Sequence, residues 1–146
     1  MLERAGWHPG RQVGIGELTD SLRSLEFDVS DAAIVFLSQF AFLYLLHEPS
    51  ILLGEERSFC WTRFDPTSVA TLRDARIARR CAEIVGKSLC PVGTDGFHFT
   101  IYIADDCSFF AGRDASVYSY GGTSFELLRL IRDGRRPTYL GEWSVG

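Results

Sequence analysis

The sequence lacks paired cysteines, long hydrophobic runs and an excess of positive charge, and each absence excludes a class of protein. Its four cysteines include no CxxC pair, so their spacing does not fit a zinc ribbon or a dithiol redox motif. The longest apolar segment, 32–46, has 15 residues, whereas a membrane-spanning helix needs roughly 20. Residues 1–13 are polar and do not resemble a signal peptide. We therefore expect a cytoplasmic protein with free thiols, no cofactor or metal, and no membrane span.

The charge of the chain is slightly negative and unevenly distributed. A net charge of −4 is not the positive charge that typifies a nucleic-acid-binding protein. Residues 1–70 carry 5 basic and 10 acidic side chains, whereas residues 71–146 carry 10 basic and 9 acidic ones. The acidic first half offers these candidates for a partner-binding surface: Glu17, Asp20, Glu26, Asp28, Asp31, Glu55 and Glu56. For any one of them, an ordinary solvated side chain is an equally good interpretation.

Length and composition indicate one folded domain over residues 1–146. Hydrophobic residues make up 46% of the chain and aromatic residues 13%. A chain of this size and composition can bury a sizeable core, which excludes intrinsic disorder. No internal repeat or low-complexity segment divides it.

Two helices are predicted in the acidic half. Leucines at helical spacing predict an amphipathic helix over about 16–26. Ser30 or Asp31 can cap a second helix that runs to about Leu46. One face of the second helix changes from polar to apolar, and the apolar part comprises Val35, Phe42 and Leu46. We favour burial of that part beneath the rest of the fold, and an apolar patch that faces a partner is the alternative.

A strand pair and a turn follow in the sequence. Residues 51–53 and 58–64 have the composition of strands. The polar segment 54–57 between them predicts a turn, in which the side chains of Glu55 and Glu56 can reach solvent. This pair is the sharpest local acidic cluster of the first half.

A long helix is predicted from Asp65 and Pro66 to about Val85. Asp65 suits the N-cap and Pro66 the first helical position, and Gly86 suits the end of the helix. Three arginines form one stripe along this helix: Arg73, Arg76 and Arg80. A solvated helix face is the simplest explanation of such a stripe.

The second half of the chain has the alternation of strands. A first strand with His98 in it covers 97–103, and two more cover 109–111 and 116–120. Turns at Asp105-Asp106 and at 113–114 connect them into an antiparallel meander.

A final helix over 124–133 is predicted from Thr123 and Glu126, which can form a capping box, and from Gly134 at its end. The order of elements predicts an α+β fold, with helices packed on one side of a mostly antiparallel sheet.

No group of residues in the sequence has the spacing of a catalytic motif. Cys60, Cys107 and His98 would be the residues of a Cys/His enzyme, but no glycine-bracketed nucleophile accompanies them. The adjacent carboxylates of Asp105 and Asp106 are explained by turn chemistry. We therefore expect a binding protein and not an enzyme.

Several segments resemble the third clade of the SUKH superfamily, which consists of bacterial immunity proteins of polymorphic-toxin systems. Residues 5–11 (AGWHPGR) resemble its N-terminal GWxPGR signature, and 36–40 (FLSQF) its FL-x-x-F helix pattern. Phe64-Asp65-Pro66 is similar to its strand-to-helix junction, and 86–93 (GKSLCPVG) to its helix stop and PVG turn. The resemblance covers about residues 3–137. The chain departs from the pattern at 41–44 (AFLY), where the family commonly has a glycine-rich segment.

The signature also has a physical interpretation. Trp7 can anchor the N-terminus against the sheet, Pro9 and Gly10 can form a turn, and Arg11 can donate hydrogen bonds to nearby carbonyls. We expect structural roles for these residues and for the other elements of the resemblance, which are Asp65, Pro66, Pro91 and Gly93.

The resemblance implies an immunity protein that binds a cognate toxin domain, commonly a nuclease or another intracellular effector, without catalysis. The acidic first half suits a basic partner, because complementary potentials steer association. Two alternatives remain: a general protein-interaction or regulatory module of SUKH-like fold, and a small enzyme with a Cys/His site.

Overall fold

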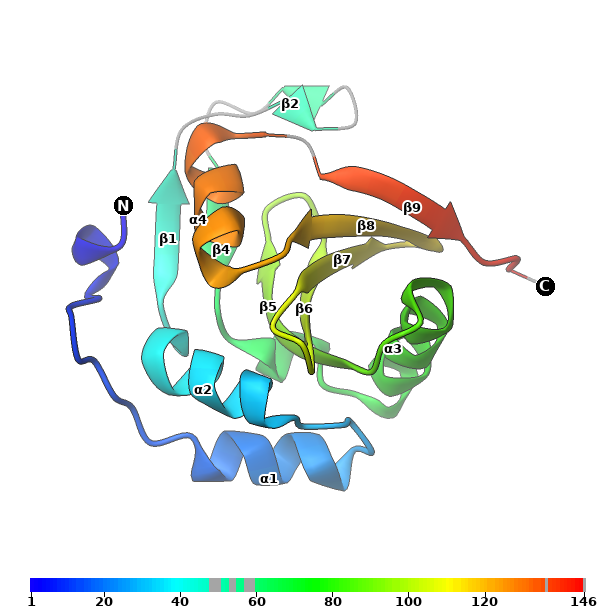
Figure 1. The fold of residues 1–146 in the computed structure, drawn as a ribbon, viewed down its shortest axis with the longest axis horizontal. Coiled ribbons are helices and arrows are strands. Elements are labelled where there is room, and N and C mark those ends of the chain that lie inside the picture. Colours follow the sequence, from blue (N-terminus) through cyan, green and yellow to red (C-terminus); the bar gives the residue numbers. More distant parts are fainter. Residues whose placement is uncertain (48–50, 53–54, 57–59, 136, 146) are drawn as a thin grey trace.

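The fold is built on one seven-stranded antiparallel sheet (Figure 1). The computed structural model describes residues 1–47, 51–52, 55–56, 60–135 and 137–145. The strand order is β1-β4-β5-β6-β7-β8-β9, and adjacent strands of this sheet are antiparallel. The strands are β1 Tyr44–His47, β4 Cys60–Arg63, β5 Leu89–Asp95, β6 Thr100–Ala104, β7 Phe109–Arg113, β8 Ser116–Gly121 and β9 Thr138–Glu142. A separate pair consists of β2 Ile51–Leu52 and β3 Glu55–Glu56.

Helices cover both faces of this sheet. They are α1 Gly16–Ser24, α2 Asp31–Phe40, α3 Leu72–Val85 and α4 Ser124–Asp133, with short 3₁₀ turns η1 Glu3–Ala5 and η2 Pro66–Val69. The ring of Phe36 on α2 packs against Phe109, which pairs with Ile103. On α3, Cys81 is hydrogen-bonded to Tyr102, which points to the opposite face because adjacent strand residues alternate. The predicted α+β class is confirmed, but the prediction that the helices pack on one side is wrong for α3.

The core beneath α2 is an aromatic cluster. The ring centroid of Phe36 lies 4.8 Å from that of Phe40, 5.2 Å from that of Phe64 and 5.1 Å from that of Phe109. Both latter contacts have the edge-to-face geometry that aromatic rings prefer. The cluster therefore joins α2 to the end of β4 and to β7.

The predicted helix from residue 30 to residue 46 is wrong in its second half. Ser30 caps α2 as expected, accepting a hydrogen bond from the backbone of Ala33, but the helix ends at Phe40. The segment after the turn pairs with β4 as strand β1. Its residues pair with partners that lie 13 to 19 positions further along the chain, and an apolar run does not reveal such a tertiary interaction. Val35, Phe42 and Leu46 are all exposed, so burial was the wrong interpretation of them.

A tight turn at the end of α2 contains an unusual residue. Ala41 has φ −55° and ψ 143°, Phe42 has φ 68°, and the amide of Leu43 donates to the carbonyl of Phe40 at 3.2 Å. This is a type II turn, whose third position needs a positive φ and therefore favours glycine. The phenylalanine stands in the segment where the resemblance led us to expect glycines.

At position 42 we expect glycine to be more favourable than alanine, although glycine usually destabilises a folded protein. Phe42→Gly should be more stable than Phe42→Ala by about 1 kcal/mol, because alanine keeps the Cβ that disfavours a positive φ. The free energies of unfolding of the two variants, measured in urea, test this. Both variants lose the same ring, so an alanine variant as stable as the glycine variant would contradict it.

The predicted long helix from Pro66 is divided in two. Asp65 caps η2 by accepting from the amide of Thr67 at 3.1 Å, and Pro66 is its first residue. A second capping box, formed by Thr71 and Asp74, then starts α3. The prediction was wrong because the Asp-Pro pair was taken as the only start. Gly86 ends α3 with φ 70°, as predicted.

The second half of the sheet contains two strands more than predicted. Pro91, Val92 and Gly93 do not form a turn, because they belong to β5 and contain a break in its register with β6. A side chain at Gly93 would place its Cβ 2.4 Å from the carbonyl oxygen of Arg63, so the close approach of β4 requires glycine there. His98 lies in the β5–β6 turn with φ 65° and not in a strand. β9 was not predicted.

Most of the remaining local predictions in this half are confirmed, but the predicted capping box of Thr123 and Glu126 forms only in part. The meander β6–β7–β8 turns at the predicted places. Thr123 caps α4 by accepting from the amide of Glu126 at 3.1 Å, and Gly134 ends the helix with φ 62°. The side chain of Glu126 reaches the amide of Gly122, one residue before the position that a capping box requires.

Candidate partner-binding surface

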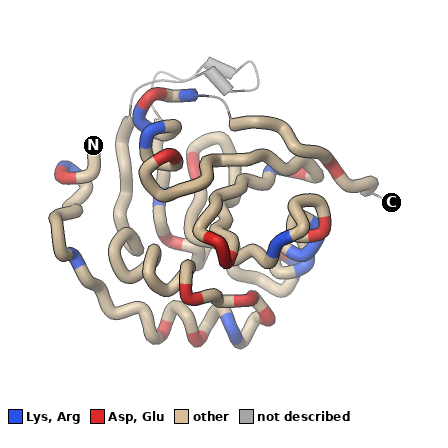
Figure 2. Tube along the Cα trace, viewed as in Figure 1, with Lys and Arg blue, Asp and Glu red and all other residues tan. Residues whose placement is uncertain are grey.

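Many acidic residues lie on one side of the molecule (Figure 2). Figure 2 shows them along α1, at the start of α2 and at the β6–β7 hairpin, whereas basic residues lie along α3. The predicted candidates Glu17 and Asp20 are exposed on α1, Asp28 is exposed in the loop after it, and Asp31 is exposed as the first residue of α2. These four candidates therefore share one end of the fold.

Some of these carboxylates are engaged by neighbouring groups. Asp28 accepts a hydrogen bond from the hydroxyl of Ser88, and Asp20 lies 3.9 Å from the guanidinium of Arg23. Glu26 pairs with Arg79 of α3 at 2.8 Å. Asp31 has neither a hydrogen bond nor an ion pair from its side chain to the described part of the chain.

The pair Glu55 and Glu56 does not lie in a turn. These residues form β3, where Glu56 pairs with Ile51 and Glu55 with Leu52. Their side chains lie outside the described part of the structure, and their role in binding stays a prediction.

A groove with an apolar floor runs beside α2. One wall consists of Asp31, Val35 and Gln39, which recur at every fourth residue of the helix. The facing wall contains Asp105 and Cys107 of the β6–β7 hairpin and Ser124 at the start of α4. The floor is formed by Ala32, Phe36, Phe40, Ile103 and Phe109. The cavity volume is about 380 Å³, and Val35 on its wall is 57% exposed.

The groove brings together acidic residues from both halves of the chain. Asp105 belongs to the second half, yet it lines the same groove as Asp31. A partner bound in this groove would therefore meet carboxylates of both halves, whereas the sequence led us to expect acidic contacts from the first half. The linear charge count misses this, because the meander folds the hairpin back against α2.

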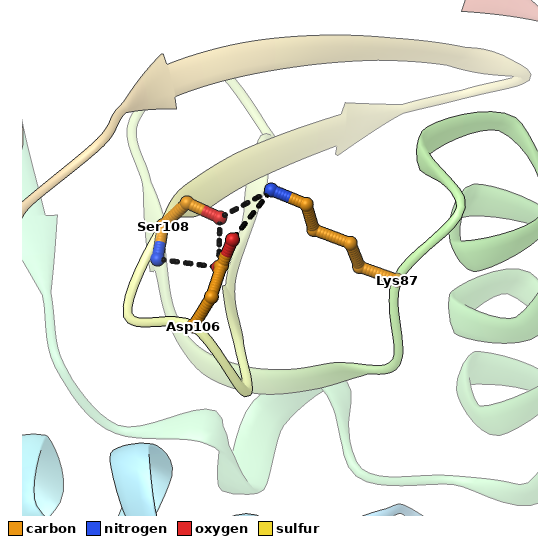
Figure 3. Close-up of polar contacts among 3 residues, drawn as sticks. All are labelled: Lys87, Asp106 and Ser108. Atoms are coloured by element: carbon orange, nitrogen blue, oxygen red, sulfur yellow. Dashed lines mark hydrogen bonds and ion pairs between the residues drawn. The ribbon is translucent and has the colours of Figure 1, made fainter.

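The two carboxylates of the hairpin have different surroundings, and Figure 3 shows those of Asp106. Asp106 lies 2.6 Å from the ammonium of Lys87 and also accepts from the backbone amide of Ser108 at 3.1 Å. These hydrogen bonds, above all that from Lys87, hold the pKa of Asp106 well below its usual range. Asp105 makes no such contact within the described residues. Asp106 thus stabilises the hairpin, while Asp105 is available at the groove.

The N-terminal signature, residues 5–11, is hydrogen-bonded to the C-terminal end of α2. Arg11 donates to the carbonyl oxygens of Gln39 at 2.6 Å and Ala41 at 2.8 Å, which are the carbonyl hydrogen bonds that the sequence predicted. Residues 8–11 form a turn in which Gly10 has φ 77° and follows Pro9. These contacts leave the N-terminal segment bound along one end of the groove-bearing helix.

Trp7 stacks on a helix and not on a strand. Its ring is nearly parallel to that of Phe40, with the centroids 6.2 Å apart, and the residue is half-buried. Trp7→Ala should therefore cost about 1–3 kcal/mol of unfolding free energy, which is less than a fully buried tryptophan would cost. Urea titration of the variant measures this.

The neighbouring His8→Ala is the matched control. His8 is exposed and bonds only to the adjacent carbonyl of Pro9, so its replacement should change stability by less than about 0.5 kcal/mol. Equal effects of the two substitutions would show that Trp7 has no anchoring role.

The other residues of the resemblance lie within the framework. Asp65 is buried and pairs with Arg63 at 2.9 Å, in addition to capping η2. Pro66 and Pro91 are both buried. None of these three residues lines the groove.

The geometry gives the Cys/His hypothesis no support. Cys60, Cys81 and Cys90 are buried, and burial raises the pKa of Cys81 to about 11 and that of Cys90 to about 12. Both thiols are therefore protonated at neutral pH. His98 lines two hollows, and no cysteine is among the described residues that line them.

Other candidate sites are equally unsupported within the described residues. There, no cluster of three or more His, Cys, Asp or Glu could hold a metal ion. None of the helices in the described part is both long and apolar enough to cross a membrane. The stripe of Arg73, Arg76 and Arg80 is exposed, and Arg80 lies 3.4 Å from Glu83.

One buried carboxylate, that of Asp95, was not among the residues singled out from the sequence. Asp95 accepts hydrogen bonds from the amides of Phe97 at 2.9 Å and Phe99 at 3.0 Å, and it also bonds to the hydroxyl of Tyr120. Burial raises its pKa to about 6. The Asp-Gly pair at 95–96 is a hairpin motif that could have revealed its position.

An α+β fold whose groove has an apolar floor and acidic walls offers a surface on which a protein partner could bind. Comparison with known protein families identifies the family: a model of the SUKH-3 immunity protein family matches residues 1–134. The chain belongs to the SUKH-3 immunity protein family, which implies an immunity role and a protein partner. Comparisons with curated proteins and with solved structures give no match.

Proposed function

We propose that this protein neutralises a cognate toxin in the cytoplasm by binding it, without catalysis. Membership of the SUKH-3 immunity protein family is the observation that carries the proposal. A nuclease or another intracellular effector that acts on an anionic substrate fits best, because such a domain presents basic residues at its active site. Binding would block that site or its substrate channel.

The distribution of charge supports a basic partner. Glu17, Asp20, Asp28 and Asp31 lie at one end of the fold, and the acidic segment of the β6–β7 hairpin is on the same side in Figure 2. An acidic surface steers a basic protein toward it and accelerates association. Glu55 and Glu56 remain part of the proposed acidic surface, as candidates that contact the toxin outside the groove.

Co-purification with the product of the adjacent toxin gene tests the proposal. The two proteins, co-expressed with a tag on the toxin, should elute together as a complex that survives moderate salt. Cells that express the toxin should grow only when this protein is present. A toxin that is recovered alone and kills cells despite co-expression would overturn the proposal.

A further inference from the structure

We propose that the groove beside α2 receives an arginine side chain of the toxin, with its guanidinium against Asp31 and Asp105 and its aliphatic stem on the apolar floor. This inference rests on the proposed function and adds the site and the chemistry of the contact. The groove, about 380 Å³ in volume, lies within the size range of sites that take a small ligand or a side chain.

Neither carboxylate of the groove forms a hydrogen bond or an ion pair with the described residues. Ser30, and not Asp31, caps α2 by accepting from the amide of Ala33 at 3.2 Å. In the hairpin, Asp106 holds the turn and pairs with Lys87. Asp31 and Asp105 therefore each stand beside a residue that does the local structural work, and their own charges face the groove without a partner among the described residues.

The floor and wall suit the stem of a long basic side chain. The floor residues Phe36, Phe40, Ile103 and Phe109 are apolar, and the apolar side chain of Val35 remains 57% exposed beside them. Lysine and arginine both bury their methylene stems on such surfaces while the charged end meets an acceptor. An apolar floor flanked by carboxylates is therefore complementary to a basic side chain and repels an acidic one.

Arginine fits this arrangement better than lysine. Its planar guanidinium presents several N–H donors at once and can bond carboxylates on two walls, and it also stacks on aromatic rings. The same negative charge disfavours a phosphate group, so direct contact with nucleic acid is not expected here.

The first experiment measures affinity with isosteric substitutions. Asp31→Asn combined with Asp105→Asn removes both charges and keeps the shape of each side chain. Removing one side of a desolvated ion pair should weaken toxin binding roughly 30- to 1,000-fold. The control combines Asp114→Asn with Glu142→Gln, which removes the same charge from exposed positions in the β7–β8 turn and on β9. Its dissociation constant should change less than about threefold.

The second experiment uses a thiol already present in the groove wall. Cys107 is exposed, whereas Cys60, Cys81 and Cys90 are buried and serve as internal controls. A bound toxin should slow alkylation of Cys107 by a maleimide at least about tenfold, because it covers the groove. This readout requires no substitution and therefore does not depend on the folding of a variant.

The outcomes separate the groove from the general function. If the wild-type protein binds and protects while the double Asn variant binds equally well, or if Cys107 stays reactive in the complex, the groove assignment is overturned and the immunity function stands. If the double Asn variant changes only self-association in sedimentation, the groove binds a second copy and the proposal is wrong. If the wild-type protein does not bind the toxin, the proposed function itself fails.

Discussion

Replacing Phe36 by alanine should lower the free energy of unfolding by about 3–5 kcal/mol, the largest effect that we expect from a single substitution. The side chain is buried and contacts three other aromatic rings, those of Phe40, Phe64 and Phe109. These rings come from α2, the end of β4 and β7. Because they hold one another in place, they cannot move far enough to fill the cavity that the alanine substitution leaves. Chemical denaturation monitored by circular dichroism measures the loss.

Two further variants show whether the effect comes from packing. Phe36→Leu keeps much of the buried volume and should cost clearly less than the alanine variant. Phe125→Ala removes an equal ring that is 67% exposed on α4, and it should cost less than about 1 kcal/mol. A Phe36→Ala loss as small as that of Phe125→Ala would mean that this cluster does not organise the core.

The protein should lose stability as the pH rises from about 4 to about 6 through the ionisation of Asp95. Burial raises the pKa of Asp95 in the folded protein to about 6, from an ordinary value of 3.8, although Arg113 and His98 nearby favour the charged form. Between these two values the folded state binds more protons than the unfolded state, so stability falls with rising pH. The shift of about two units corresponds to about 3 kcal/mol, fully lost above the folded pKa.

Asp95→Asn isolates this contribution. Asparagine keeps the oxygen that accepts from the amides of Phe97 and Phe99, but it does not ionise. The stability of the variant relative to the wild type should therefore rise by about 2–3 kcal/mol between pH 4 and pH 7. Taking the difference removes the opposite slope from carboxylates whose pKa is lowered, such as Asp106 and Asp133. If the difference in unfolding free energy between the variant and the wild type does not change with pH, the pKa of Asp95 is not raised in the folded protein and the prediction is wrong.

Features coded by neighbouring residues could be predicted from the sequence. The caps at Ser30, Asp65 and Thr123 and the helix ends at Gly86 and Gly134 appear where the residue types indicated. Each depends on backbone groups within about one helical turn, so a short window of sequence contains the whole interaction.

Features that depend on distant partners could not be predicted in this way. β1 was taken as the end of a helix, because the apolar run does not show that β4 lies beside it. β9 was missed for the same reason, since its partner β8 precedes α4. In β5, Pro91 suggested a turn, but the register break next to it accommodates the missing amide.

The acidic character of the candidate site could be predicted from the sequence, but its position could be predicted only in part. The acidic residues of α1 and α2 could be found by counting charges, and Asp31 does line the groove. Asp105 was set aside as turn chemistry, although the neighbouring Asp106 does that work. Only the folded meander shows that a carboxylate of the second half faces α2.

The central claim, that this protein neutralises a toxin by binding and not by catalysis, is tested most directly by titrating purified toxin activity. With the toxin held at a concentration well above the dissociation constant, activity should fall in proportion to added protein and vanish at a fixed stoichiometric ratio. The end point should not move with incubation time, and active toxin should be recovered after denaturation and refolding. Inactivation of many toxin molecules by one molecule of this protein, growing with time, would contradict the account.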